Sequence, residues 1–166
     1  MKHRQKTSPE FRAELLKERI YATLALLAVL FTIDPSHTPP LKAAAIIACT
    51  ALTLWAASLV ASGMSYRVIM QEQAPEWKIR QQFVLHSPLL LAAAFPLLTV
   101  MMAASGFTSL STAIVVAIAA SLLLLLSWSL LSARAMKAGR LATLVLTATE
   151  LAIGLTIVSL KLIVNH

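Results

Sequence analysis

One carboxylate lies inside a strongly apolar stretch towards the end of the chain. Glu150 follows Thr147 and Thr143 at helical spacing, within an apolar segment 141–164 that holds no other acidic residue. Residues three and four apart share a face of an α-helix, so these side chains form one polar stripe. A carboxylate at the centre of a bilayer costs about 3 kcal/mol even on lenient insertion scales. We consider two interpretations: a proton- or cation-binding site centred on Glu150, or a neutral acid that hydrogen-bonds to a neighbouring helix.

The other chemically capable residues are scattered. The four histidines are far apart in the sequence and Cys49 is the single cysteine, so we predict no metal site and no disulfide. His86 is interpreted as an interfacial anchor at the start of a helix, with pH sensing or proton shuttling as the alternative. No nucleophile–base pair, phosphate-binding loop or paired carboxylates are apparent. We therefore predict neither an enzyme activity nor a cofactor.

Composition places these residues in a membrane protein. Of 166 residues, 58% are hydrophobic and only 13% are charged, and the mean hydropathy is +0.80. These values exclude an intrinsically disordered chain, a disulfide scaffold and an ordinary soluble domain, which averages near 25% charged residues. The formal net charge of +7 would suggest nucleic acid in a soluble protein.

The apolar segments predict an all-α integral membrane bundle with five transmembrane helices. A bilayer core about 30 Å thick requires roughly 20 mostly apolar helical residues. The first span is interpreted as a membrane helix rather than a signal peptide, because Glu10, Glu14 and Glu18 lie in its basic approach and Ser8-Pro9 reads as a helix start. The chain is predicted to be a single transmembrane domain, 1–166, in which a basic segment 1–14 precedes spans at about 15–33, 43–66, 83–105, 108–132 and 141–164.

The basic residues predict the orientation. Twelve of the 14 precede or open the first span, or fall between the second and third spans or between the fourth and fifth. The positive-inside rule then gives a cytoplasmic N-terminus and an outside C-terminus. The positive charge is therefore a topological signal, and we predict no nucleic-acid partner. The residues predicted to contact lipid headgroups are Arg12, Lys17, Arg19, Arg67, Arg134, Lys137 and Arg140.

Two further features concern packing. Pro96 lies in the middle of the third span, where it removes a backbone hydrogen bond and should kink the helix. In the second span, Ser58 and Ser62 are four residues apart, as are Ala57 and Ala61. Small residues at this spacing let helices approach closely, within one protomer or in a dimer.

The last three spans carry a resemblance to a known family. The third span contains Phe95-Pro96-Leu97-Leu98, and it is followed by a long apolar helix, the basic linker 133–140, and a final helix with Glu150 and Gly154. The first helix opens with Glu18-Arg-Ile-Tyr21. This pattern resembles the vacuolar iron transporter family, and the resemblance implies that family's five-helix core and homodimer. The acidic residues that the family uses for metal have no counterpart in the first two spans, so the resemblance does not imply iron transport. The chain also resembles small bacterial multi-pass membrane proteins.

These observations lead to two functional hypotheses. The first is a small homodimeric transporter or channel-like protein for cations or protons in the bacterial inner membrane, with Glu150 as the binding group. The alternative is a membrane scaffold or regulatory subunit, whose basic cytoplasmic face binds a protein partner or anionic lipid.

Overall fold

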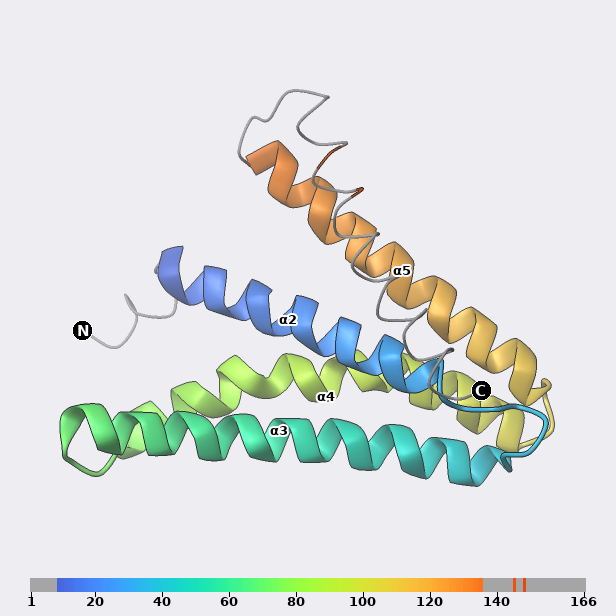
Figure 1. The fold of residues 1–166 in the computed structure, drawn as a ribbon, viewed down its shortest axis with the longest axis horizontal. Helices are drawn as coiled ribbons and strands as arrows, with labels where there is room; N and C mark the ends of the chain where they lie inside the picture. Colours follow the sequence, from blue (N-terminus) through green and yellow to red (C-terminus); the bar gives the residue numbers. More distant parts are fainter. Residues whose placement is uncertain (1–8, 136–144, 146–147, 149–166) are drawn as a thin grey trace.

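Long α-helices joined by short loops make up the described chain (Figure 1). The computed structural model describes residues 9–135, 145 and 148. Within these residues there is no strand, as the sequence predicted. The predicted fifth span, 141–164, falls outside the described residues apart from two isolated positions. The helices are α2 (Pro9–Leu30), α3 (Pro40–Met70), α4 (Glu76–Ala104) and α5 (Leu110–Ala135).

Local sequence sets the helix ends. α2 begins at Pro9 with Glu10 in its first turn, and α3 begins with Pro40 after a second proline; proline suits a first turn, where its missing N–H would have no helical partner. α3 ends at Gln71, whose φ of 55° is left-handed and whose N–H donates to the carbonyl of Arg67. The hairpin between α4 and α5 turns at Gly106, which has a φ of +83°.

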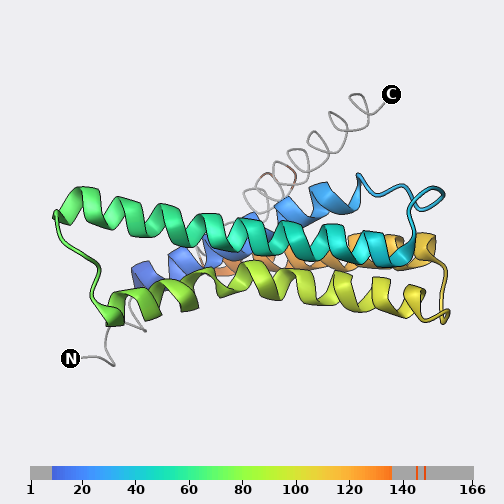
Figure 2. The same cartoon turned by 90° about the horizontal axis from the view of Figure 1, so that it is seen from below.

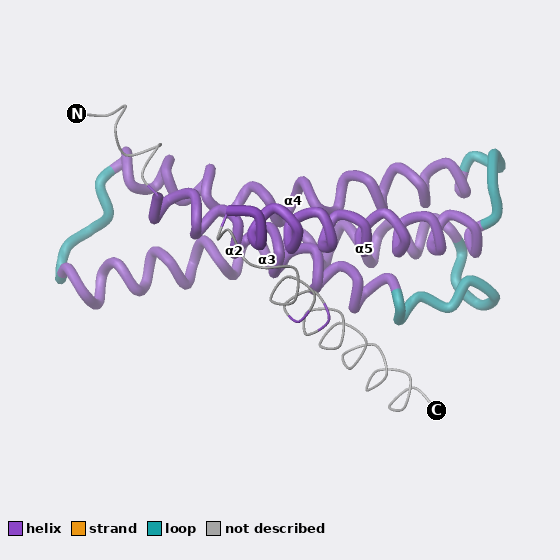
Figure 3. The backbone as a smooth tube through the Cα atoms, turned by 90° about the horizontal axis from the view of Figure 1, so that it is seen from above, coloured by secondary structure: helices purple, strands orange, loops and turns teal. Residues whose placement is uncertain are grey.

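The helices alternate in direction, so their loops gather at two ends. The loops 31–39 and 105–109 lie at one end, and loop 71–75 lies at the other (Figure 3). α3 and α4 run antiparallel and side by side (Figures 1 and 2). α2 and α4 each pack against the other three helices, and α4 has the more extensive packing, mainly with α3. We call the two ends of the bundle the 71–75 end and the 31–39 end.

The core lies where α2, α4 and α5 meet the first half of α3. Leu26 and Leu30 of α2 pack there with Ile47 of α3 and Val100 of α4, all at most 2% exposed. α5 contributes small or branched residues at helical spacing, which let it lie close to α4. These residues are Leu110, Ala113, Ile114 and Ala117.

Three helices of the described chain are long and apolar enough to cross a membrane, namely α3, α4 and the segment Leu110–Trp128 of α5. Between 22% and 39% of their most apolar windows is buried inside the protein, so most of their apolar surface faces outward, as in a protein that lipid surrounds. α2 is not among the three, since the first half of this helix carries several charged residues. Its apolar second half nevertheless packs into the core.

Candidate functional site

The residues predicted to bind a proton or cation are not among those that the structure describes. Glu150, Thr147 and Thr143 all lie outside the described ranges, as do Lys137 and Arg140. A site around Glu150 therefore stays a prediction.

A buried polar cluster that sequence reasoning missed lies between α2, α3 and α4. The Nε2 atom of His86 is 2.9 Å from the hydroxyl oxygen of Ser62. Its Nδ1 atom is 3.5 Å from a carboxylate oxygen of Glu18, and the side chains of His86 and Glu18 are only 5% and 13% exposed. One imidazole thus links three helices. We call Glu18, Ser62 and His86 the polar cluster.

Each member of the polar cluster extends a buried stripe of its own helix. On α2, Glu18 precedes Ala22, Leu26 and Leu30 at intervals of four residues, and those three are at most 2% exposed. This spacing brings residues onto one helix face, and it is the signal by which the cluster could have been found. On α4 the buried stripe is His86, Leu89, Ala93, Pro96 and Val100. On α3, buried Ala43, Ile47 and Ala51 are followed on the same side by half-buried Ser58 and Ser62.

Two prolines shape the helix that carries His86. Pro88 has no N–H, so it cannot donate to the carbonyl of Val84, four residues earlier. The Ser87 hydroxyl donates to that carbonyl instead, at 2.8 Å. Pro96 lies within the continuous helix α4 and is itself fully buried. The buried ring therefore serves packing, one of the uses that proline has in membrane helices.

The neighbouring arginine does not compensate the charge of Glu18. Consecutive helical residues point about 100° apart, and the guanidinium carbon of Arg19 lies 5.2 Å from the ring centroid of Trp128 on α5. Within the described chain, Oε2 of Glu18 and Nδ1 of His86 are buried and make no hydrogen bond. Their 3.5 Å contact with each other, which is an ion pair when His86 is protonated, is therefore the main electrostatic feature of the polar cluster.

The polar cluster lies towards the 71–75 end of the bundle. Ser62 precedes the end of α3 at Met70 by eight residues, or about 12 Å at 1.5 Å per residue. It follows the start of α3 at Pro40 by 22 residues, or about 33 Å. Because the hydrocarbon core of a bilayer is about 30 Å thick, a bilayer that begins at the 31–39 end would reach its opposite boundary near Ser62.

Aromatic and basic side chains surround the 71–75 end. The Nζ atom of Lys78 lies 5.2 Å from the ring centroid of Tyr66 and 5.6 Å from that of Trp77. Such residues are typical of a membrane–water boundary. Arg67 donates from Nε to the carbonyl of Gly63 at 3.4 Å. Of the predicted headgroup contacts, Arg12, Lys17, Arg19 and Arg67 are exposed, and the side chain of Arg134 is not described.

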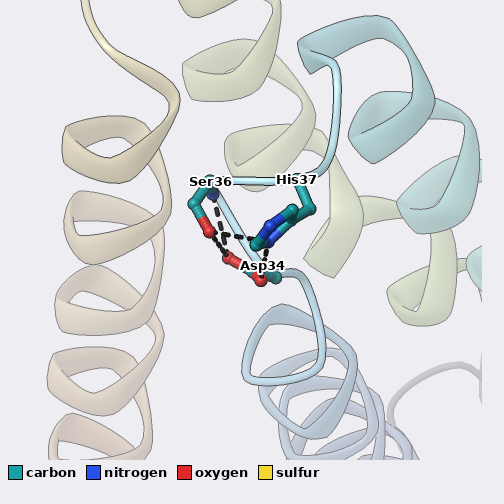
Figure 4. Close-up of polar contacts among 3 residues, drawn as sticks. All are labelled: Asp34, Ser36 and His37. Carbon is teal, nitrogen blue, oxygen red and sulfur yellow. Dashed lines mark hydrogen bonds and ion pairs between the residues drawn. The ribbon is translucent and has the colours of Figure 1, made fainter.

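A second polar group occupies the loop at the 31–39 end (Figure 4). Asp34 accepts the hydroxyl of Ser36 at 2.6 Å and its backbone N–H at 2.9 Å, and lies 2.7 Å from Nδ1 of His37. The Ser36 hydroxyl, followed by the His37 ring, holds the pKa of Asp34 at about 2. The group is exposed, and the described residues contain no cluster of three or more histidines, cysteines or carboxylates that could hold a metal.

The geometry corrects one sequence interpretation. His86 is not a surface anchor, because it is only 4% exposed and contacts α2 and α3. The sequence reasoning also did not foresee that the Ser62 hydroxyl and the His86 ring lie within hydrogen-bonding distance. Both points were missed because the two residues are 24 positions apart and become neighbours only through antiparallel helix packing.

Comparisons with protein-family models, curated proteins and solved structures found no match for this chain. The functional argument therefore rests on the polar cluster and on the membrane character of the helices around it.

Proposed function

We propose that the chain is a multi-pass membrane protein that moves protons, or a cation in exchange for protons, through the polar cluster. The observation that carries the proposal is the buried imidazole of His86 held between Glu18 and Ser62. Ionisable groups inside a membrane protein are costly, and they commonly mark proton and ion pathways. Histidine suits this role because it changes charge near neutral pH.

The arrangement of the polar cluster provides a route for a proton. Ser62 contacts one ring nitrogen of His86, and Glu18 faces the other. An imidazole can accept a proton at one nitrogen and release a proton from the other. His86 would pass protons between the α3 side and the α2 side in this way. The position of the cluster near the 71–75 end would give it access to water from that end of the bundle.

The proposal includes the finer features expected from the sequence. The chain crosses the bacterial inner membrane five times as a homodimer, with its N-terminus in the cytoplasm and Glu150 further along the same pathway. The resemblance to the five-helix core of the vacuolar iron transporter family belongs to this proposal as well.

Orientation is tested by placing a cysteine at Ser36 or at Gln73 in a Cys49→Ser background. An impermeant maleimide should label the Ser36 position in intact cells and the Gln73 position only after permeabilisation. The reverse pattern would contradict the orientation.

Proton movement is tested by reconstitution into liposomes that enclose a pH-sensitive dye. Wild-type protein should dissipate an imposed pH gradient, while Glu18→Gln and His86→Asn should slow this flux at least tenfold. Glu14→Gln is the matched control, because Glu14 lies one turn earlier on α2 and is exposed. Absence of wild-type flux in either direction, with and without added monovalent or divalent cations, would refute the proposal. Equal flux in all variants would show that the polar cluster takes no part in proton movement.

The exposed basic residues favour a second function. Arg12, Lys17 and Arg67 are exposed in the part of the bundle that carries the 71–75 end, where they can bind anionic lipid or an acidic protein partner. Basic side chains near a charged membrane surface contribute about 1 kcal/mol each. A scaffold of this kind should bind anionic nanodiscs or a specific partner in wild-type form and lose binding in a Lys17→Gln/Arg67→Gln variant. Unchanged binding in that variant would contradict this function.

A further inference from the structure

The polar cluster has the order of groups that activates a serine nucleophile. The hydroxyl oxygen of Ser62 is 2.9 Å from Nε2 of His86, and Nδ1 of the same ring faces Glu18 at 3.5 Å. Nucleophile and base within hydrogen-bonding distance, with the base oriented by a third group, are the recurring signature of covalent catalysis. The His86–Glu18 distance is longer than a hydrogen bond, as is common before substrate binds.

We propose that Ser62 is a nucleophile activated by His86 and Glu18, and that its substrate is a carboxylic ester of a membrane lipid. This activity goes beyond proton movement and does not depend on it. It depends on the placement of α3 in a membrane. Glu18 would orient the imidazole and stabilise its protonated form.

The surface around Ser62 supports access from lipid. Ser62 itself is half-buried, and Ser65, three residues later on the same side of α3, is exposed. Ala61, on the adjacent side, is also exposed. Among the described residues, a Cβ atom added at Gly63 would meet nothing within 4 Å. Within the described part of the chain, an ester can therefore reach the edge of the α3 face that carries Ser62.

The depth of Ser62 supports a lipid ester in particular. Ser62 lies about 12 Å along α3 from the end of that helix, one turn before Tyr66, whose ring contacts Lys78. Aromatic and basic residues of this kind gather where the hydrocarbon meets the headgroups. The ester bonds of glycerolipids lie at the same boundary, so their carbonyl carbons are at the level of the Ser62 hydroxyl.

The chain also offers a charged donor at the residue that follows Ser62. The amide groups around Ser62 lie in the interior of α3, where helical hydrogen bonds use them. Arg67 instead donates from Nε to the carbonyl of Gly63, at 3.4 Å. A guanidinium has five N–H donors, and in the proposed reaction the remaining ones would turn towards the negative oxygen that forms during attack.

The reaction balances with water as the co-reactant. The Ser62 oxygen attacks the ester carbonyl carbon while its proton passes to Nε2 of His86. The bond from the carbonyl carbon to the alcohol oxygen breaks, and the leaving alcohol takes that proton. A water molecule then attacks the acyl-serine, giving one proton to Nε2 and its hydroxyl to the acyl carbon. Ser62 leaves and recovers the proton, so the products are a fatty acid and a lysolipid.

The test is labelling of purified full-length protein in nanodiscs with a fluorophosphonate probe, followed by peptide mass spectrometry. Wild type should carry the probe on Ser62. Ser62→Ala should abolish labelling, and His86→Asn should slow it at least about 100-fold. Ser58→Ala is the matched control, since Ser58 lies one turn earlier on the same stripe, and it should be labelled like wild type.

A second measurement identifies the substrate. Wild type in phosphatidylglycerol nanodiscs should release fatty acid and lysolipid, whereas Ser62→Ala should release neither. Peptide mapping of wild type needs no variant to fold, so an unlabelled Ser62 would overturn the proposal by itself. Equal labelling of wild type and His86→Asn would also overturn it. Labelling without fatty-acid release would overturn the lipid-ester substrate. Probe-labelled Ser62 and released fatty acid in a protein that shows no proton flux would support the lipid-ester proposal alone, and this separates the two proposals.

Discussion

Replacing His86 with leucine should leave the Glu18 carboxylate buried without its partner and destabilise the protein by about 3 kcal/mol. Glu18→Leu should cost less, about 1–2 kcal/mol, because Ser62 still contacts Nε2 of His86. The double variant should lose less free energy of unfolding than the sum of the losses in the two single variants. Apolar residues that replace both members of a buried ion pair are often neutral for stability.

The magnitude of the coupling follows from distance and burial. When His86 is protonated, it and the Glu18 carboxylate are opposite unit charges 3.5 Å apart, which attract by about 5 kcal/mol at an effective dielectric constant near 20. Desolvation of each buried ion, which is several kcal/mol, offsets much of this attraction. Because the side chains of Glu18 and His86 are only 13% and 5% exposed, solvent screening is weak. We expect a coupling free energy of about 2 kcal/mol between these two residues.

A double-mutant cycle measures this coupling. Reversible unfolding in mixed micelles, followed by tryptophan fluorescence, gives the free energy of unfolding of each variant. Thr99→Val is the control partner for Glu18→Leu, because Thr99 is buried and donates only within α4, to the carbonyl of Pro96. That control pair should be additive within about 0.5 kcal/mol. A Glu18–His86 coupling below about 0.5 kcal/mol would refute the reasoning that the pair interacts.

Three other predictions concern the rest of the fold. The pKa of Asp34 is about 2, against an ordinary 3.8. The contacts of this carboxylate in the loop therefore stabilise the protein above about pH 4, and that stabilisation is lost as the pH falls through 2. Carboxyl NMR titration measures the pKa of Asp34. Gly106→Ala should destabilise by about 1 kcal/mol because φ is +83°, whereas Gly63→Ala should be neutral or stabilising in thermal unfolding. Arg19→Gln should lose about 0.5 kcal/mol and change the fluorescence of Trp128, whose ring Arg19 contacts.

Each of these predictions has an outcome that contradicts it. An Asp34 carboxyl that titrates near 4 would mean that the contacts with Ser36 and His37 do not form in solution. If alanine has the same effect on thermal unfolding at Gly106 and at Gly63, the positive φ of Gly106 does not contribute to stability. Unchanged fluorescence in Arg19→Gln would show that Arg19 does not contact the ring of Trp128.

Much of the helical layout could be predicted from apolar length and proline. The predicted second, third and fourth spans correspond to α3, α4 and α5, and the predicted start near Pro9 is that of α2. The helix limits were less predictable. α3 continues past Arg67 to Met70, because a single arginine near a membrane boundary does not end a helix and three apolar residues follow it.

The candidate site could not be predicted in the same way. Ser62 was interpreted from its small size as a packing residue, and His86 from its position as an anchor. Nothing in the local sequence of α3 or α4 says that their buried faces bring these two side chains within 2.9 Å. The four-residue spacing of Glu18 from Ala22, Leu26 and Leu30 is the one sequence signal that could have placed a member of the polar cluster on an apolar face.

The sequence by itself determined that this chain is helical and apolar, and where its long helices lie. The reason is that helix length and hydropathy depend on residues near one another in the chain. The tertiary structure alone decided which polar groups meet. Glu18, Ser62 and His86 come from three helices, and the antiparallel packing of α3 and α4, with α2 against them, brings them together. Contacts between distant residues depend on helix rotation and register, which packing of the buried faces fixes.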